Sequence, residues 1–254
     1  MKYCVCTESL FMEKESIYTA LEKVHACGFD AYEFWFWWQY DLERLKGIQD
    51  ELGMQCVGTC AKFTTSTGDP KHQDVYLDDF KASVDAACTL GCKNLIVQAG
   101  WEVPEVSHEL HRATFIDTVQ KAAPIAAAAG VDLIVEPLNI KVDHAGYHLS
   151  DTEEAFQVIE QIGCPNVKIL FDIYHQQISN GFIIESLREH LDKVGHIHVA
   201  GCPGRHEITT GELNYRNIFH ALREMDYRGY VGLEYFTDAP VEPGLEEAKK
   251  LFVY

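Results

Sequence analysis

Short apolar runs follow glycines at regular intervals along this chain. Seven glycines each separate an amphipathic stretch from a β-branched or aromatic run: Gly28, Gly53, Gly91, Gly130, Gly163, Gly195 and Gly229. Such an order is typical of a helix, a left-handed C-terminal cap and a strand. With an opening strand at residues 2–6, the pattern predicts eight strands joined by helices.

The spacing of these glycines indicates how the strands are arranged. Successive glycines lie between 25 residues (Gly28 to Gly53) and 39 residues (Gly91 to Gly130) apart. Each interval can hold a strand and the crossover helix that parallel pairing requires. No G-x-G-x-x-G follows the first strand, so an open doubly wound sheet is the weaker alternative. We therefore predict an α/β protein with one (β/α)8 TIM barrel domain spanning residues 1–254.

Composition narrows the classes of function. A formal net charge of -18 disfavours binding to nucleic acid or to an anionic membrane surface. No run approaches the roughly 20 apolar residues of a membrane span, and the start lacks a secretory signal pattern. The nine cysteines are odd in number and include no C-x-x-C pair. These features predict a cytoplasmic protein with free thiols and no disulfide framework.

Four consecutive late strands are expected to end in residues that bind metals. They are Glu136 in L-I-V-E, Asp172 in I-L-F-D, His198 in H-I-H-V and Glu234 in V-G-L-E. In a barrel the carboxyl ends of the strands form one mouth, where the active site lies. Three buried carboxylates there would be costly without a compensating charge, which a divalent cation supplies.

The choice of metal follows from these ligand types. Oxygen-rich ligands with a single imidazole favour Mn or Mg, with Co as a further candidate, over a structural zinc. The alternative is that each acid caps the following helix or pairs with a basic residue at the rim. Four such residues on adjacent strands favour the metal.

Further residues near the predicted mouth are weaker candidates. His175 and Arg205 are expected to bind substrate, because a guanidinium can hold a carboxylate in bidentate fashion. His196 is expected to be a hydrogen-bonded interior residue. Core packing is the favoured role for Phe36 and Trp38, and a place in the wall of the pocket is the alternative for either. Roles stay open for Glu33, Lys62, Gln98, His206, Glu207 and Glu212.

The motifs together resemble a known family. V-E-P-L-N, F-D-I-Y-H, G-R-H-E-x-x-T-G-E-L-N-Y and G-L-E-Y are similar to those of the hydroxypyruvate isomerase branch of the xylose isomerase-like barrel superfamily. The similarity is strongest over residues 130–236 and extends more loosely to C-G-F-D-A-Y-E-F-W-F. It implies that Glu136, Asp172, His198 and Glu234 hold the metal. It also implies that Glu136 and Glu234 are the acid-base pair and that His175 and Arg205 contact substrate.

The resemblance implies isomerisation of hydroxypyruvate to tartronate semialdehyde through an enediolate. His198 is more typical of the ketose 3-epimerases of this superfamily, so epimerisation of a ketose is the alternative. A homo-oligomer is also implied. A non-catalytic metal-binding barrel is a further alternative, and the net charge argues against a superfamily endonuclease.

Overall fold

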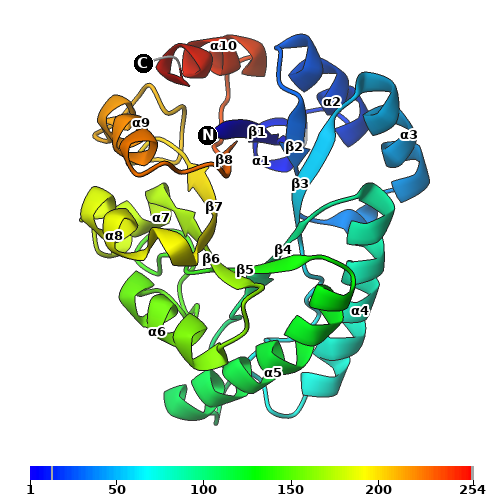
Figure 1. Cartoon of the computed structure of the whole chain (residues 1–254), viewed down its shortest axis with the longest axis vertical. Coiled ribbons are helices and arrows are strands. Elements are labelled where there is room, and N and C mark those ends of the chain that lie inside the picture. The colour runs from blue at the N-terminus through cyan, green and yellow to red at the C-terminus, as the bar shows by residue number, and fades with distance from the viewer. Residues whose placement is uncertain (13, 253–254) are drawn as a thin grey trace.

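Eight parallel strands close into a barrel in chain order, β1 to β8, with β1 paired to β8. This computed structural model describes residues 1–12 and 14–252. Helices form a ring around the strands (Figure 1). The predicted (β/α)8 barrel is therefore confirmed. The strands are β1 (Lys2–Cys6), β2 (Ala31–Glu33), β3 (Gln55–Cys60), β4 (Asn94–Gln98), β5 (Asp132–Glu136), β6 (Val167–Asp172), β7 (Val194–Val199) and β8 (Tyr230–Leu233).

The helices alternate with the strands, as right-handed crossovers between parallel neighbours require. They are α1 (Thr7–Phe11), α2 (Ile17–Ala26), α3 (Leu42–Leu52), α4 (Gln73–Leu90), α5 (His108–Ala128), α6 (Thr152–Ile162), α7 (Ile173–Ser179), α8 (Ile183–His190), α9 (Tyr215–Glu224) and α10 (Val241–Phe252), with short 3-10 turns η1 (Trp37–Gln39) and η2 (Leu191–Lys193). No helix among the described residues is long and apolar enough to cross a membrane.

Five of the seven glycines lie in the left-handed region after a helix, as predicted. They are Gly28, Gly53, Gly91, Gly130 and Gly163, with φ between 66° and 79°. The prediction is wrong for Gly195 and Gly229. Gly195 lies inside β7, where a methyl group would approach Ile134 Cγ2 and Lys168 Cβ to 2.9 Å. A glycine is therefore needed at position 195 because neighbouring strands pack closely there. It does not cap a helix.

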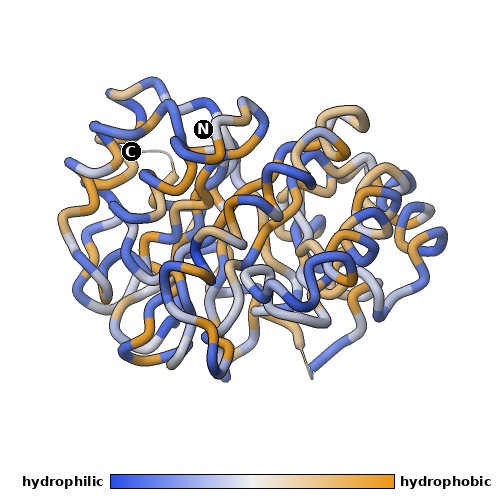
Figure 2. Tube along the Cα trace, turned by 90° about the horizontal axis from the view of Figure 1, so that it is seen from below, coloured by the Kyte–Doolittle hydropathy of each residue, from blue (hydrophilic) through white to orange (hydrophobic). Residues whose placement is uncertain are grey.

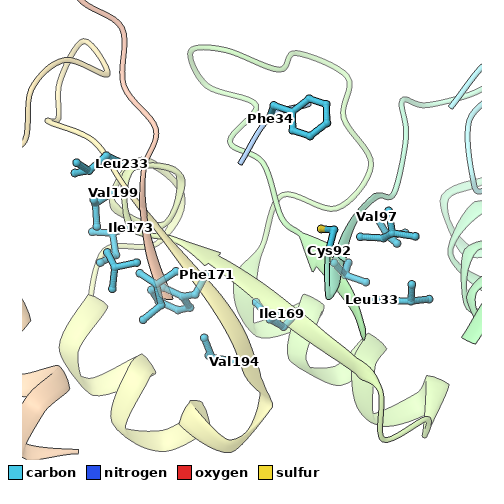
Figure 3. Packing of buried hydrophobic residues seen from close by; sticks show 14 of the residues in the cluster. Phe34, Cys92, Val97, Leu133, Ile169, Phe171, Ile173, Val194, Val199 and Leu233 are labelled. Atoms are coloured by element: carbon cyan, nitrogen blue, oxygen red, sulfur yellow. The ribbon is translucent and has the colours of Figure 1, made fainter. Parts of the chain in front are cut away.

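The core has an outer layer between strands and helices and a smaller interior inside the barrel. The outer layer includes Val97, Leu133 and Ile169 on β4, β5 and β6 (Figure 3). Apolar and polar positions alternate along the trace (Figure 2), and the buried apolar ones make up the core. Because strand side chains alternate between faces, the residues next to these point inward. The interior holds two small apolar clusters, namely Cys60, Ile96, Ile134 and Leu170, and Cys4, Ala31 and Val57.

All nine cysteines are free, which confirms the prediction of unpaired thiols. Seven of them are buried, and six of those lie in β1, β3 and the turns that end α2 and α4. Cys88 is exposed on α4. The thiols therefore act mainly as small apolar side chains in the core.

Candidate active site

Four side chains meet at the mouth of the barrel, where β5 to β8 end. They belong to Glu136, Asp172, His198 and Glu234, which are all buried, and one ligand atom of each lies within 4.8 Å of the others. His198 Nδ1 lies 3.2 Å from Glu234 Oε2 and 3.7 Å from Glu136 Oε1. The structure thus brings together the four residues that were expected to meet at the strand ends.

Asp172 divides its carboxylate between two tasks. Oδ1 accepts hydrogen bonds from the backbone amides of Tyr174 (2.7 Å) and His175 (3.2 Å), and so caps α7. Oδ2 is buried without a hydrogen-bond partner. The alternative that each acid merely caps the next helix therefore accounts for one oxygen of Asp172 and leaves the other facing the site.

Glu234 is held by two donors from distant parts of the chain. Trp35 Nε1 donates to Oε1 at 2.7 Å, and Arg205 Nη2 donates to Oε2 at 2.5 Å. Burial by itself would raise the pKa of this carboxyl group. The positive charges of His198 and Arg205 outweigh burial and hold the pKa of Glu234 well below its usual range. Glu234 is therefore ionised.

The remaining groups respond to the same surroundings in different directions. Burial raises the pKa of Glu136, and it raises the pKa of Asp172 to about 7. Burial disfavours the charged form of His198, but the carboxylates of Glu234 and Glu33 outweigh it and raise its pKa. Several carboxylates are thus forced close together with incomplete neutralisation.

The unpaired atoms of this cluster fit a divalent cation. Asp172 Oδ2, Glu136 Oε1 and His198 Nδ1 are all buried without hydrogen-bond partners. Each unsatisfied buried polar atom costs about 1–3 kcal/mol, and three of them converge here. Three carboxylates with one imidazole form a ligand set that oxygen-preferring divalent metals accept. These four residues could therefore hold a metal ion.

A second polar pair lies beneath this cluster inside the barrel. His196 Nε2 donates to Glu33 Oε2 at 2.8 Å, and both side chains are 1% exposed. The prediction of a hydrogen-bonded interior role for His196 is confirmed. The positive charges of His198 and His196 outweigh the effect of burial and lower the pKa of Glu33 to about 2.

A cavity of roughly 300 Å³ opens at this site, and two of the four residues, Glu136 and Glu234, line it. Five of its twelve lining residues are Trp or Phe, and five others carry polar or charged side chains. It is lined by Trp35, Phe36, Cys60, Phe63, Gln98, Trp101, Glu136, Leu138, His144, Arg205, Glu234 and Phe236. Arg205 is 11% exposed, and its guanidinium lies between the rings of Tyr174 and Phe236, 5.5 Å from each centroid. Such stacking leaves its Nε, buried without a partner, as a spare donor.

Some of the weaker candidates line the cavity, and others lie outside it. Arg205, Gln98 and Phe36 line the cavity. Trp38 does not, and packs edge-on against Phe63 instead, 6.0 Å between centroids. Lys62 pairs with Asp79 on α4 at 3.0 Å.

The loop after β7 supplies only Arg205 to the cavity. His206 is exposed and hydrogen-bonded to the Phe236 carbonyl, and exposed Glu212 accepts from Gln177. Glu207 is half-buried and also outside the cavity lining.

His175 is buried beside Asp172 and does not line the cavity. Its Nδ1 accepts from the backbone amide of Asn139 at 3.3 Å, so its proton lies on Nε2. Nε2 has no hydrogen-bond partner and lies 3.7 Å from Asp172 Oδ2. Contact between His175 and substrate stays a prediction.

Several cavity residues were missed by sequence reasoning, among them Trp35 and His144. Trp35 was visible in the run of aromatic residues after β2, but no pattern singles it out from its neighbours. His144 lies in the loop after β5, and its Nε2 is buried without a partner. The position of that loop after a ligand-bearing strand was the one signal that could have indicated His144.

Comparison with known proteins gives consistent matches. The family described as xylose isomerase-like TIM barrel matches residues 21–253. Hydroxypyruvate isomerase of Escherichia coli (strain K12) is 31% identical, over 88% of this chain and 89% of that protein. 2-Oxo-tetronate isomerase of Cupriavidus necator is 31% identical, over 87% of each. The resemblance inferred from the motifs is confirmed.

Solved structures agree with the fold. An AP endonuclease, family 2, from Brucella melitensis has a TM-score of 0.93 at 24% identity, covering 98% of this chain and 99% of that one. D-psicose 3-epimerase with D-tagatose from Clostridium cellulolyticum H10 has a TM-score of 0.82 at 21% identity, covering 97% and 89%. At these identities the likeness shows the barrel alone.

Proposed function

Because this chain belongs to the xylose isomerase-like TIM barrel family, we propose that it is a divalent-metal-dependent isomerase of a short hydroxy-keto acid. Hydroxypyruvate, converted to tartronate semialdehyde, is the substrate we favour. Relatives at 31% identity are named for hydroxypyruvate and for 2-oxo-tetronate. Both compounds are 2-oxo acids with a hydroxyl group on the next carbon.

One observation carries this proposal. Unpaired buried atoms of Asp172, Glu136 and His198 converge beside a cavity whose lining includes Glu136 and Arg205. Mn²⁺ or Mg²⁺ suits the ligand set. When bound by Glu136, Asp172, His198 and Glu234, the cation would polarise the substrate carbonyl and make the adjacent carbon more acidic.

The side chains then divide the remaining work. Glu136 has a free Oε1 and removes the C3 proton of hydroxypyruvate, which gives an enediolate. Glu234, which is ionised, accepts the O3 hydroxyl proton and passes it to C2, and Glu136 then gives its proton to O2, so the product is an isomer of the substrate. Both carboxylates thereby return to their starting ionised state.

The cavity walls favour a short, acidic substrate. Arg205 Nε is a buried donor with no partner and is available to a substrate carboxylate. Beyond it the walls are rings such as Phe63, Trp101 and Phe236, which offer few partners for the hydroxyl groups of a long sugar. These rings also exclude water from the enediolate.

Proton NMR in deuterated buffer tests the proposal. Protein loaded with Mg²⁺ is incubated separately with hydroxypyruvate, 2-oxo-tetronate and a ketose, beside Glu136→Gln and chelator-treated samples. We expect solvent deuterium to enter hydroxypyruvate and its aldehyde product, with loss of exchange in both controls. Exchange only at C3 of the ketose would instead identify an epimerase, and no exchange with any substrate would leave a non-catalytic barrel.

A further inference from the structure

A carboxylate that belongs to none of the four strand-end residues lies directly under them. Glu33 ends β2, is 1% exposed, and reaches across the barrel interior toward β7. Its Oε2 accepts from His196 Nε2 at 2.8 Å. Its Oε1 lies 3.2 Å from His198 Nε2, a charge contact without hydrogen-bond alignment, and neither of these buried atoms has a hydrogen-bond partner. Glu33 therefore stands between two histidines of the same strand.

The ring of His198 has a carboxylate on each side. Nε2 faces Glu33 on the interior side, and Nδ1 faces Glu234 at 3.2 Å and Glu136 at 3.7 Å on the cavity side. An ionised carboxylate only accepts hydrogen bonds. Glu33 therefore favours a proton on Nε2, and a metal held by Glu136 and Glu234 would take the Nδ1 lone pair in place of a proton.

The barrel makes room for this carboxylate with one glycine, Gly232. Gly232 of β8 and Gly58 of β3 lie on either side of Glu33. A methyl group on Gly232 would lie 1.9 Å from Glu33 Oε1 and 2.9 Å from His198 Cδ2. On Gly58 it would lie 3.5 Å from Glu33 Oε2, an ordinary contact. The carboxylate of Glu33 thus fills space that β8 leaves free.

We propose that Glu33 is a positioning residue for the metal ligand His198. Its charge favours the Nε2 proton of His198 and holds the ring so that Nδ1 faces the metal, and His196 holds Glu33 in turn. A carboxylate behind a metal-binding histidine fixes the ring and makes the ligand nitrogen more basic. This inference rests on the proposed metal-dependent function and adds a residue that does not touch substrate.

Glu33→Gln separates positioning from a merely structural role. The amide keeps the size of the side chain but carries no charge, so it cannot favour the Nε2 proton of His198 as the carboxylate does. The matched control is Gln49→Leu. Gln49 is buried on α3 and accepts from the hydroxyl of Tyr32, the residue before Glu33, at 3.0 Å. It contacts β2 without contacting His198.

Two measurements on the full chain loaded with Co²⁺ test whether Glu33 positions His198. The first is the Co²⁺ dissociation constant, by competition with a chelator. We expect it to rise about tenfold to a hundredfold in Glu33→Gln, and to stay unchanged in Gln49→Leu even if that variant unfolds at lower urea. The second is the NMR signal of the His198 Nε2 proton, shifted by Co²⁺. We expect this proton to exchange slowly with water in the wild type and rapidly, or not to appear, in Glu33→Gln.

The outcomes separate this inference from the proposed function. A wild-type Co²⁺ affinity and an unchanged proton signal in Glu33→Gln would overturn the role of Glu33 and leave the metal site intact. Failure of the wild type to bind Co²⁺, Mn²⁺ or Mg²⁺ would overturn both. If Glu33→Gln does not fold, the wild-type spectrum still decides, because coordination through Nε2 in place of Nδ1 contradicts the arrangement.

Discussion

The indole of Trp35 donates a hydrogen bond from Nε1 to Oε1 of Glu234 across 2.7 Å. It joins the segment after β2 to the end of β8, although the two residues are 199 positions apart. Glu8 fixes that segment from below, since its carboxylate accepts from the backbone amides of Trp35 and Phe36 and from the Tyr40 hydroxyl. One wall of the cavity thereby also orients a proposed metal ligand.

Replacing Trp35 by Phe should impair catalysis without unfolding the protein. The ring still walls the cavity, but Glu234 loses one of its two donors. We expect kcat/KM for hydroxypyruvate to fall about tenfold to a hundredfold, as for other partners of metal ligands. Trp38→Phe is the matched control, because Trp38 lies in the same segment and does not line the cavity. Equal losses in both variants would refute a specific role for Trp35.

Alanine at Gly232 should weaken Mn²⁺ binding, whereas alanine at Gly58 should leave it unchanged. Gly232→Ala places a methyl group 1.9 Å from Glu33 Oε1, so the Glu33 carboxylate and the His198 ring must shift. We expect weaker Mn²⁺ binding, by tenfold or more. Gly58→Ala meets only an ordinary contact and should bind Mn²⁺ like the wild type. Isothermal titration of both variants with Mn²⁺ tests this, and similar affinities would contradict it.

Adding Mn²⁺ to chelator-treated protein should raise its stability. The metal neutralises carboxylates that burial otherwise disfavours, and it binds the folded state only. At a concentration 100 times the dissociation constant, the free energy of unfolding should rise by about 2.7 kcal/mol. Urea unfolding with and without Mn²⁺ measures the gain. Asp172→Asn should reduce it, whereas an unchanged gain in that variant would place the ion elsewhere.

A stack of histidines outside the site should make the fold sensitive to acid. His148 packs against His111 at 3.7 Å between ring centroids. Burial, aided by the charges of His111 and His108, lowers the pKa of His148 to about 3. The unfolded chain gains a proton here below pH about 6.5 while the folded protein stays neutral. The free energy of unfolding therefore falls as pH drops from about 6.5 toward 3. The loss caused by His148 is about 2 kcal/mol at pH 5.

His148→Phe removes this titration and keeps an aromatic ring in the stack. The difference in unfolding free energy between pH 7.5 and pH 5, from urea denaturation, should shrink by about 2 kcal/mol. His25→Phe, at an exposed position on α2, is the control and should leave the difference unchanged. If His148→Phe shows the same difference in unfolding free energy between the two pH values as the wild type, other groups cause the acid sensitivity.

Much of the architecture follows from local patterns. Glycines such as Gly53 and Gly163 end helices because a left-handed residue is needed there, and apolar runs after them form parallel strands. Once the strands are parallel and closed, their carboxyl ends meet at one rim. Residues at strand ends, such as Glu136 and Asp172, can therefore be assigned to one site from the chain alone.

The amino-acid sequence by itself determined the barrel, the absence of a disulfide framework and the set of four convergent side chains. Only the tertiary structure decided which atoms of these side chains stay unpaired, which rings wall the cavity, and that Glu33 lies beneath His198. Those features depend on contacts between segments such as β2, β7 and β8, far apart in the chain. Such contacts follow from strand register and loop path, and no local periodicity encodes them.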